Sequence, residues 1–467
     1  MIADLKPYPA MKDSGVPWLG KVPEHWDVVP AWAAYRPKLI RNTGMMEKTV
    51  LSLSYGQIIV KPPEKLRGLV PESFETYQII DPGEIIVRTT DLQNDQNSLR
   101  IGYSKNRGII TAAYMCLTTT DCMKPAFGYQ FLRTYDLLKI IYGYGSGLRQ
   151  NLDFTHIKRM PVLIPPLHEQ AAIVRFLDHA DQRIQRYIRA KQKLIKLLEE
   201  QKQVIIHRAV IRGLDPNIRL KPSGMEWLKD IPEHWPIYRA KLLLRQVMPE
   251  IPDKAEMVTC FRDGQVTLRR NRRTEGFTNA IKELGYQGIK PGQLVLHSMD
   301  AFAGAIGISD SAGKCSPEYV ICEPATDSVF LPYYAYLLRS LALRGLFVVL
   351  CPSVRERAPR VRFSHFGSFV LPNPPIIEQK KIVEYIQTAC CEVDQTLNTT
   401  RREIGLLREY RTRLIADVVT GKLDVREAAA RLPDEAEEPE PFNETEVLTA
   451  DGEFADDLEP IPEEVES

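Results

Sequence analysis

The sequence predicts an α+β protein built as a pseudo-twofold internal repeat, in which two strand-rich globules are joined by two long antiparallel helices. Three observations predict this fold class. The phrase PEHW occurs at residues 23–26 and again at residues 232–235, an offset of 209. Many further positions recur at the same offset. Each unit then ends in about 40 residues whose apolar positions alternate in spacings of four and three, which is typical of a paired helix.

The repeat runs from the opening phrase to the ends of the long helices. Trp18 aligns with Trp227, and the pattern PP..EQ..IV at residues 165–174 recurs at residues 374–383. The middle of each unit slips by four positions, because GYSKNRGIITAAYM aligns best with GISDSAGKCSPEYV at an offset of 205. The sequence therefore predicts a duplication of one unit rather than a solenoid.

The same repeat predicts the domain boundaries. The first part of each unit is rich in Gly, Pro and short β-branched runs such as GEIIVRTTD, which indicate short strands. Prolines precede each long helix, and the glutamate of LHEQ or IIEQ falls in its first turn, where it favours the helix dipole. We expect a first globule at 1–164, a helix at 165–212, a second globule at 213–373, a helix at 374–421, and an acidic, disordered tail at 422–467.

The two helices are expected to pair with each other. A seam sustained over five heptads is typical of a coiled coil, and about 40 residues span ~60 Å, which is long for a helix that packs only on its own globule. That packing is the alternative. The expected pairing residues are Ile173, Leu177, Ile184, Leu194 and Leu198 in the first helix, and Ile382, Ile386, Val393, Leu407 and Leu414 in the second.

The charge distribution indicates a polyanionic partner for the folded part. The chain has 61 Lys and Arg against 60 Asp and Glu, a net charge of +1. Fifteen acidic residues and no basic residue follow Pro433, so residues 1–433 hold 61 basic and 45 acidic residues, a net of +16. Such a balance suits nucleic acid but does not by itself establish it.

Composition also predicts the compartment. The first twenty residues lack the apolar core of a signal peptide, and the most apolar later stretch, YLLRSLALRGLFVVLC, is interrupted by Arg339 and Arg344. The eight cysteines include no C-x-x-C pair, which is typical of reduced thiols. We therefore expect a cytoplasmic protein.

The order globule, helix, globule, helix predicts a geometry. A twofold axis across the helix pair makes the helices antiparallel and places one globule at each end. DNA has local twofold axes of the same kind, so two such heads can read two half-sites. Because the heads differ in sequence, the half-sites need not be palindromic, and a length of ~60 Å limits their separation to under about 18 base pairs.

The chain resembles the specificity subunit of type I restriction–modification systems. The resemblance rests on the PEHW opening of each unit, on GLRQNLDFTHIKRMPVLIPPLHEQAAIVRFLD and on its partner FSHFGSFVLPNPPIIEQKKIVEYI. It covers residues 13 to about 424, in the family's order. The second unit departs from it in the loop CPSVRERAPRVRFSHF, and the acidic tail has no counterpart that carries a known role.

The resemblance implies two target recognition domains joined by two long conserved helices. It implies that these helices bind two modification subunits, which hold S-adenosylmethionine and methylate adenine. In the full complex it implies two restriction subunits, which use ATP and Mg²⁺. It further implies that this chain binds double-stranded DNA, carries no cofactor of its own and catalyses nothing.

Motifs that could indicate chemistry in this chain are incomplete. NPPI at residues 373–376 lacks the aromatic residue that amino-methyltransferases stack on a flipped base, and its counterpart in the first unit begins with Ile164. SAGKC around Lys314 misses the phosphate-loop spacing. FAGAIG at residues 302–307 aligns with a strand of the first unit rather than with a cofactor loop. Catalysis by this chain, or a metal site in it, is therefore not expected.

The candidate DNA contacts are basic and amide side chains outside the repeated phrases. Arg and Lys pair with guanine edges, Asn and Gln pair with adenine, and most basic contacts go to phosphate. The run RRNRR is favoured because its charges repel one another unless a polyanion neutralises them. The candidates are Arg88, Thr89, Lys105, Arg107, Arg149, Gln150 and Asn151 in the first unit, and Arg269, Arg270, Arg272, Arg273, His297, Arg355, Arg357 and Arg360 in the second.

Two further hypotheses remain open at this point. The chain could be a two-headed DNA-binding or structural scaffold that works without methylase partners. An enzyme that fuses recognition with catalysis is disfavoured, because no cofactor motif is complete. The target sequence cannot be predicted, because recognition loops follow no transferable code.

Overall fold

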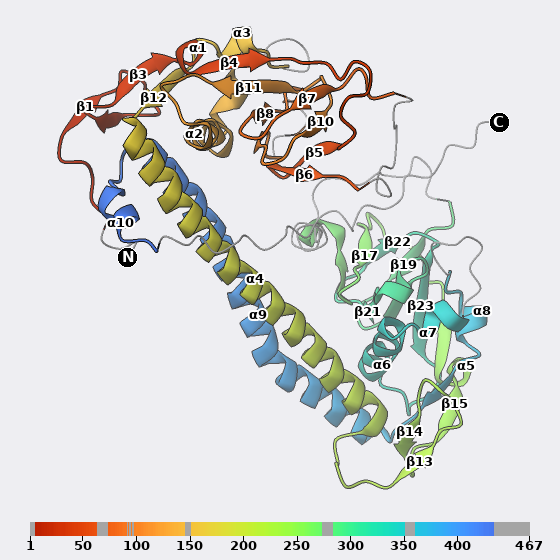
Figure 1. The fold of residues 1–467 in the computed structure, drawn as a ribbon. Coiled ribbons are helices and arrows are strands. Elements are labelled where there is room, and N and C mark those ends of the chain that lie inside the picture. The colour runs from red at the N-terminus through yellow and green to blue at the C-terminus, as the bar shows by residue number, and fades with distance from the viewer. Residues whose placement is uncertain are drawn as a thin grey trace. The chain divides into compact units, whose positions relative to one another are not determined.

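The computed structural model describes residues 5–62, 73–90, 92, 95, 98–144, 151–272, 284–350 and 360–433. Contacts divide the chain into a first unit, Met1–Ala190 with Glu403–Glu440, and a second unit, Lys191–Arg402 with Pro441–Ser467. Each long helix therefore contributes one half to each unit. The fold is α+β, as predicted, with two strand-rich globules and two long helices (Figure 1).

The globule of the first unit is a set of small antiparallel sheets with one central helix. Its four-stranded sheet has the order β4-β11-β8-β9, and the pairs β1-β2, β3-β12, β5-β6 and β7-β10 surround it. The strands are β1 Met11–Asp13, β2 Lys21–Pro23, β3 Asp27–Pro30, β4 Tyr35–Lys38, β5 Leu51–Ser54, β6 Gln57–Val60, β7 Gln78–Ile80, β8 Ile85–Val87, β9 Ile101–Tyr103, β10 Gly108–Ile110, β11 Met115–Thr119 and β12 Pro161–Ile164. The helices are α1 Ala31–Ala34, α2 Pro125–Leu137, η2 Ile140–Gly143 and α3 Phe154–Ile157.

The globule of the second unit repeats this topology. Its four-stranded sheet has the order β16-β23-β20-β21, with the pairs β13-β14, β15-β24, β17-β18 and β19-β22. The strands are β13 Leu220–Pro222, β14 Asp230–Pro232, β15 Ile237–Arg239, β16 Leu244–Val247, β17 Val258–Cys260, β18 Val266–Leu268, β19 Gln287–Ile289, β20 Leu294–His297, β21 Ile306–Ile308, β22 Gly313–Cys315, β23 Tyr319–Pro324 and β24 Val370–Pro372. The helices are α5 Ala240–Leu243, η3 Arg269–Asn271, η4 Ala301–Ala303, α6 Leu331–Leu343, α7 Leu346–Leu350 and α8 Phe363–Phe366.

The central strand of each four-stranded sheet is apolar on both faces because both faces are covered. Side chains alternate along a strand, so neighbours point to opposite sides. In β20, Leu294 and Leu296 join the core around α6, whereas Val295 joins the core formed by β17, β19 and β22. The residues Leu294 to Leu296 of β20 are therefore apolar without interruption. In a sheet with only one covered face, apolar and polar residues would alternate.

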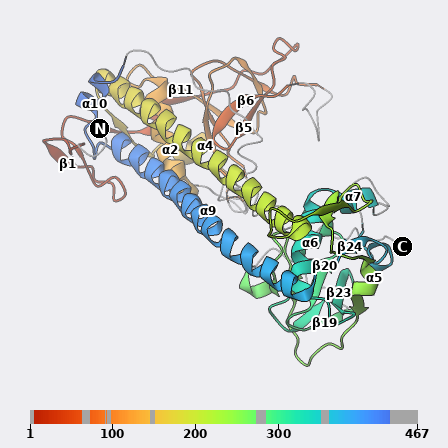
Figure 2. The same cartoon turned by 90° about the horizontal axis from the view of Figure 1, so that it is seen from below.

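The long helices α4 (Leu167–Arg212) and α9 (Ile376–Val419) pack antiparallel, as predicted (Figures 1 and 2). Within the first unit, Arg411 of α9 donates to the Asp181 carboxylate of α4 at 2.9 Å. Within the second unit, Lys202 donates to the Asp394 carboxylate at 2.6 Å. Residue numbers rise along one helix as they fall along the other in these contacts, which fixes the antiparallel direction.

The buried seam differs in phase from the predicted one. Tyr187 and Leu194 are exposed, whereas Ile188 is buried, and a regular spacing of four and three continues through half-buried Ile195. Leu194 is therefore not a pairing residue. In α9, Leu397 and Ile404 are also buried between the predicted Val393 and Leu407. Both phases satisfy the heptad spacing, so periodicity alone did not separate them.

The other predicted pairing residues are covered in the structure. In α4, Ile173, Leu177 and Ile184 are buried and Leu198 is half-buried. In α9, Ile382, Ile386 and Leu414 are buried, while Val393 and Leu407 are half-buried. Part of this burial is against the globules, because Ile382 and Ile386 belong to the core of the second unit around α6.

Part of the segment expected to be a disordered tail is folded. Residues 422–433 are ordered, with a short helix α10 (Arg426–Ala430) and a β-bridge between Lys6 and Asp424. Val425, Ala429 and Leu432 are buried, and these apolar side chains explain why the segment folds. The remaining residues, 434–467, lie outside those that the structure describes.

The seam can be tested with a matched pair of substitutions. Ile188→Ala should lower the free energy of unfolding by about 2–4 kcal/mol, because it removes buried methyl groups from a packed seam. Leu194→Ala should change it by less than about 0.5 kcal/mol, because that side chain is exposed. Urea denaturation of the full chain measures both. The seam is assigned wrongly if Leu194→Ala proves the more destabilising substitution.

Candidate nucleic-acid interface and its frame

In the first unit the repeated phrase binds a carboxylate at the start of α4. The Nε2 atom of His25 lies 2.7 Å from Glu169 Oε1, and the Trp26 indole N–H donates to Glu169 Oε2 at 3.0 Å. Glu169 lies in the first turn of the helix, where unpaired N–H groups favour a negative charge. Trp26 is fully buried, so its N–H needs this acceptor.

The second unit repeats this arrangement. His234 Nε2 lies 2.8 Å from Glu378 Oε1, and the Trp235 indole N–H donates to Glu378 Oε2 at 2.8 Å. The repeated phrase therefore joins the entry of each globule to the base of its own helix. Glu24 and Glu233 of the phrase are exposed, and the helix glutamates supply the carboxylate.

The glutamine that follows each glutamate fixes the central helix of the globule. Gln170 accepts from the Lys124 backbone N–H at 2.7 Å and donates to the Cys122 carbonyl at 2.9 Å. Gln379 accepts from the Phe330 N–H at 2.8 Å and donates to the Ser328 carbonyl at 2.8 Å. These backbone groups immediately precede α2 and α6. In each unit, therefore, the glutamate binds the repeated phrase and the adjacent glutamine binds the start of the central helix.

A glycine after each long helix packs against the repeated phrase. We call the phrase, the Glu-Gln pair at the start of one helix and the glycine after the other the frame. Gly213, after α4, has φ +73°, and a Cβ there would lie 3.3 Å from the Trp235 ring. Gly421, after α9, has φ +75°, and a Cβ there would lie 2.4 Å from Pro23. Both the left-handed backbone and the lack of space require glycine. Each repeated phrase thus lies between the start of one long helix and the end of the other.

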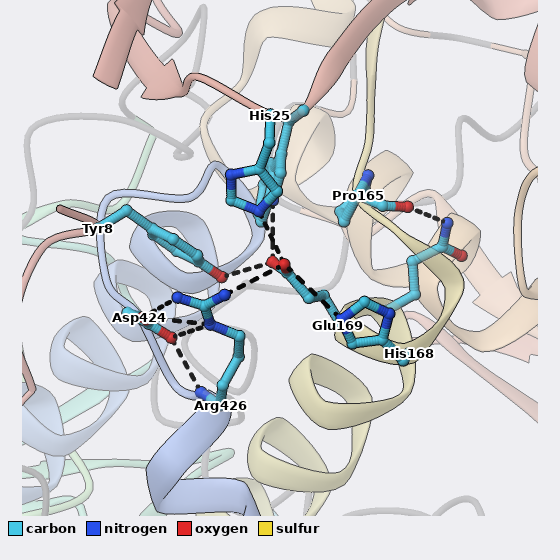
Figure 3. Close-up of polar contacts among 9 residues, drawn as sticks. Tyr8, His25, Pro165, His168, Glu169, Asp424 and Arg426 are labelled. Carbon is cyan, nitrogen blue, oxygen red and sulfur yellow. Dashed lines mark hydrogen bonds and ion pairs between the residues drawn. The ribbon is translucent and has the colours of Figure 1, made fainter. Parts of the chain in front are cut away.

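The first unit adds a group of contacts around Glu169, here called the clasp, that the described residues of the second unit do not make around Glu378 (Figure 3). The Tyr8 hydroxyl donates to Glu169 Oε2 at 3.2 Å, and Arg426 Nη1 donates to Glu169 Oε1 at 3.4 Å. The Arg426 guanidinium also lies 4.9 Å from the centre of the Tyr8 ring and binds Asp424 at 2.7 Å. As a result the Glu169 side chain is 2% exposed, whereas that of Glu378 is 37% exposed.

The pKa shifts at the clasp agree with this geometry. Burial raises the pKa of the Tyr8 hydroxyl, and the Glu169 carboxylate beside it raises it further. Burial alone would raise the pKa of the Asp424 carboxyl, but the hydrogen bonds and charge of Arg426 hold it below its ordinary value. The clasp is therefore built from an ionised Asp424 and Arg426 with a neutral Tyr8.

Three predicted DNA contacts of the first unit have intramolecular partners. Arg88 donates to Asp95 at 3.0 Å, and Arg107 donates to Asp81 at 2.6 Å. Thr89 is buried with its hydroxyl bonded to the Ala113 carbonyl at 2.7 Å, so that hydroxyl donates inside the globule.

The rest of that set is more open or is not described. Lys105 is exposed. Burial raises the pKa of the Asp178 carboxyl in α4, and the charge of Lys105 opposes that shift. Asn151 is exposed. Arg149 and Gln150 lie outside the described residues.

Two arginines of the RRNRR turn in the second unit have acidic partners in the same chain. Arg270 pairs with Glu256 at 2.8 Å, and Arg272 pairs with Asp263 at 2.6 Å while covering the Phe261 ring at 4.2 Å. The turn as a DNA contact stays a prediction. The adjacent Arg269 donates to the Thr259 hydroxyl at 3.2 Å.

The other candidates of the second unit differ in exposure. His297 is buried and bonded to Asp300 at 2.8 Å, so it does not present its ring to a ligand. Arg360 is half-exposed and lies 3.5 Å from Glu318. Arg273, Arg355 and Arg357 lie outside the described residues. The exposed cations remain predicted DNA contacts.

The structure adds a feature that sequence reasoning missed. A cavity of about 420 Å³ lies in the second unit, lined by the side chains of Gln246, Ser298, Arg360, Arg362 and Phe363 among others. Arg362 is exposed beside it. Its counterpart in the first unit is Asp153, which caps α3. The signal available from sequence was this change of charge between aligned positions.

The NPPI segment has a structural role. The Asn373 side-chain oxygen accepts from the Tyr334 hydroxyl at 2.8 Å and from the Gln379 amide at 3.1 Å, and Asn373 is buried. Its polar atoms are thus engaged at the base of α9. Within the described part of the chain there is no cluster of His, Cys, Asp and Glu suited to a metal ion. No helix among the described residues is long and apolar enough to span a membrane.

The frame predicts unequal effects of the same substitution in the two units. Glu169→Gln should destabilise the chain by about 3 kcal/mol or more, because it leaves buried donors facing an amide. Glu378→Gln should have an effect of about 1 kcal/mol, because fewer donors face a more exposed group. Denaturant midpoints followed by tryptophan fluorescence measure both. In an Arg426→Met background, Glu169→Gln should lower the free energy of unfolding by less than it does in the wild type. Equal losses of stability from Glu169→Gln and Glu378→Gln would contradict the role of the clasp.

Comparison with known proteins agrees with this geometry. Residues 41–197 match the family described as the type I restriction modification DNA specificity domain. A chain from a structural study of complex assembly and conformational transition of the type I R-M system aligns with a TM-score of 0.61 and 15% identity. That alignment covers 86% of this chain and 99% of the other.

Two crystal structures of the same kind of subunit give lower scores. The HsdS subunit from Thermoanaerobacter tengcongensis aligns with a TM-score of 0.42 and 15% identity, over 86% of this chain and 98% of that one. The S subunit from M. genitalium aligns with a TM-score of 0.32 and 12% identity, over 84% and 96%. The family match covers about a third of the chain, and the fold is shared at a TM-score of 0.61 with a chain from the type I R-M system.

Proposed function

We propose that this chain is a specificity subunit of a type I restriction–modification system. It reads a bipartite, asymmetric DNA site, with one half-site for each globule, and positions modification and restriction subunits on it. The observation that supports this most is the combination of a repeated frame with loops that are not repeated. The Glu169 and Glu378 contacts match within a few tenths of an ångström. The exposed polar and basic side chains around them differ between the units.

The exposed faces of the long helices favour protein partners. On the second unit's half of α4, Leu194, Leu197 and Val204 are 42%, 53% and 59% exposed. On the first unit's half of α9, Leu406 and Tyr410 are 56% and 38% exposed. Leu197 and Leu406 are equivalent in the repeat. Equivalent exposed leucines on the two halves suit two copies of one partner, here the modification subunit.

Catalysis in the complex is assigned to those partners. Modification subunits would hold S-adenosylmethionine, and restriction subunits would use ATP and Mg²⁺. This chain contributes DNA recognition and assembly, with its helix faces as the proposed partner surfaces and its exposed cations as the proposed phosphate and base contacts.

The proposal is tested by co-expressing the chain with a modification subunit from the same genome. We expect a complex of two modification subunits and one specificity subunit, and adenine methylation at one bipartite motif in a methylome comparison. Failure to form a complex, or methylation without sequence preference, would contradict the proposal. A stable DNA-binding chain without a complex would instead support a standalone two-headed binder.

The partner surface has its own test. Leu197→Glu and Leu406→Glu should each remove one modification subunit, and the double variant both, because a charge replaces an exposed apolar contact. Light scattering coupled to size exclusion measures the stoichiometry. The matched controls are Leu138→Glu and Leu343→Glu, at exposed leucines beside the ends of α2 and α6, which should assemble normally. Normal assembly of Leu197→Glu would exclude this surface.

A further inference from the structure

The half of α4 that belongs to the first unit carries a line of basic side chains along one face. Residues three and four apart are neighbours on a helix surface, and the spacings in this line are four, four, three and three. We call the line the basic stripe, and it consists of Arg175, His179, Arg183, Arg186 and Arg189. Arg175, Arg183 and Arg186 are exposed, and His179 and Arg189 are half-buried. At ~1.5 Å per residue the stripe is about 21 Å long.

The charges of the basic stripe act on one another. Burial lowers the pKa of His179, and the charges of Arg183 and Arg186 lower it further. This stretch of α4 holds four arginines and only two aspartates. One of these, Asp181, already accepts from Arg411 of α9 at 2.9 Å. The stripe is therefore a surface of positive potential that favours a negatively charged occupant.

The basic stripe is not repeated in the second unit. The positions 209 further on, in α9, include two acids and no cation, and they are Glu384, Thr388, Glu392, Gln395 and Asn398. A surface that bound two copies of one partner would be expected on both long helices. The stripe therefore suits an occupant that is present in one copy.

An acidic segment of the same chain begins beside the basic stripe. Arg175 Nη2 donates to the backbone carbonyl of Leu432 at 2.8 Å and to that of Pro433 at 3.1 Å, within the first unit. Fifteen Asp and Glu and no Lys or Arg follow Pro433, and five of the first seven residues after it are acidic. The acidic segment therefore starts at a residue that is bonded to one end of the stripe.

The acidic segment is also long enough to follow the basic stripe. Its 34 residues, 434–467, span up to about 110 Å when extended, against about 21 Å for the stripe. A single exposed ion pair contributes little to stability, but several pairs on a tethered segment act together at a high effective concentration. Charge, starting point and length thus all fit this segment as the occupant.

We propose that residues 434–467 bind the basic stripe of α4 and keep it from binding DNA of arbitrary sequence. Duplex DNA is a polyanion, so it competes with the acidic segment for the same cations. The acidic segment thus lowers non-specific DNA binding by the long helix. Its binding to the stripe is independent of the proposed function, because no target sequence has to be read.

The first test measures how tightly the full-length chain binds a duplex of random sequence, by fluorescence anisotropy. A variant with the fifteen acidic residues after Pro433 replaced by Asn and Gln should bind about 10-fold more tightly at ~50 mM salt, because the basic stripe is uncovered. In a chain that also carries Arg183→Gln and Arg186→Gln, the same replacement should tighten binding by less than about 3-fold, because fewer phosphates can be neutralised there.

A matched control separates binding at the stripe from a general effect of net charge. Lys21→Gln with Arg159→Gln also removes two exposed cations of the first unit, both outside the stripe. In that chain, replacing the acidic residues should still tighten DNA binding about 10-fold. If the replacement has equal effects in the stripe variant and in this control, the acidic segment acts through net charge alone and the proposal is overturned.

The second test detects the contact without DNA. Arg186→Lys places an amine on the stripe, and a carbodiimide should join it to carboxylates of residues 434–467, as identified by mass spectrometry. The same substitution at Arg159 should give few such links, and about 1 M salt should suppress them, because it screens charges beyond ~3 Å. The proposal fails if Arg186→Lys forms no link to the acidic segment. If Arg183→Gln with Arg186→Gln then also loses a modification subunit, that partner occupies the stripe instead.

Discussion

The structure depends on one carboxylate at the start of each long helix. Glu169 and Glu378 accept from the His and Trp of the repeated phrase, and the glutamine beside each one holds the central helix of the globule. A negative charge is favourable at a helix N-terminus and pairs well with donors that are otherwise buried. Because strand entry, central helix and long helix meet at two adjacent side chains, the globule cannot rotate about its helix without breaking several hydrogen bonds.

Much of the frame could be predicted from the sequence. The offset of 209 aligned the phrases, the glutamates and the helices, so the duplication, the fold class and the antiparallel pair were all predictable. The sequence did not predict that Glu169 and Glu378 bind the phrase. A glutamate in the first turn of a helix is already explained by the helix dipole. The contact between Trp26 and Glu169 joins residues 143 apart, and sequence periodicity carries no information about such a pair.

The candidate interface was harder to predict than the frame. A sequence shows that Arg270 and Arg272 are cationic but not that Glu256 and Asp263 fold against them. The same limit applied to the seam, where Ile188 and Tyr187 satisfy the heptad spacing equally well and only packing distinguishes them. Charge and spacing define sets of residues, and tertiary contacts decide which members stay available to a ligand.

The division of the long helices between the two units has a consequence for biosynthesis. The described part of the second unit is one continuous stretch of chain between residues 191 and 402. The first unit also needs residues 403–433, which supply half of α9, the glycine beneath Trp26 and the Arg426 clasp. Domains usually complete their folding in the order in which the ribosome releases them. Here the order is reversed: the second unit can finish while the first still waits, with Glu169 and Trp26 uncovered, for a segment translated more than two hundred residues later.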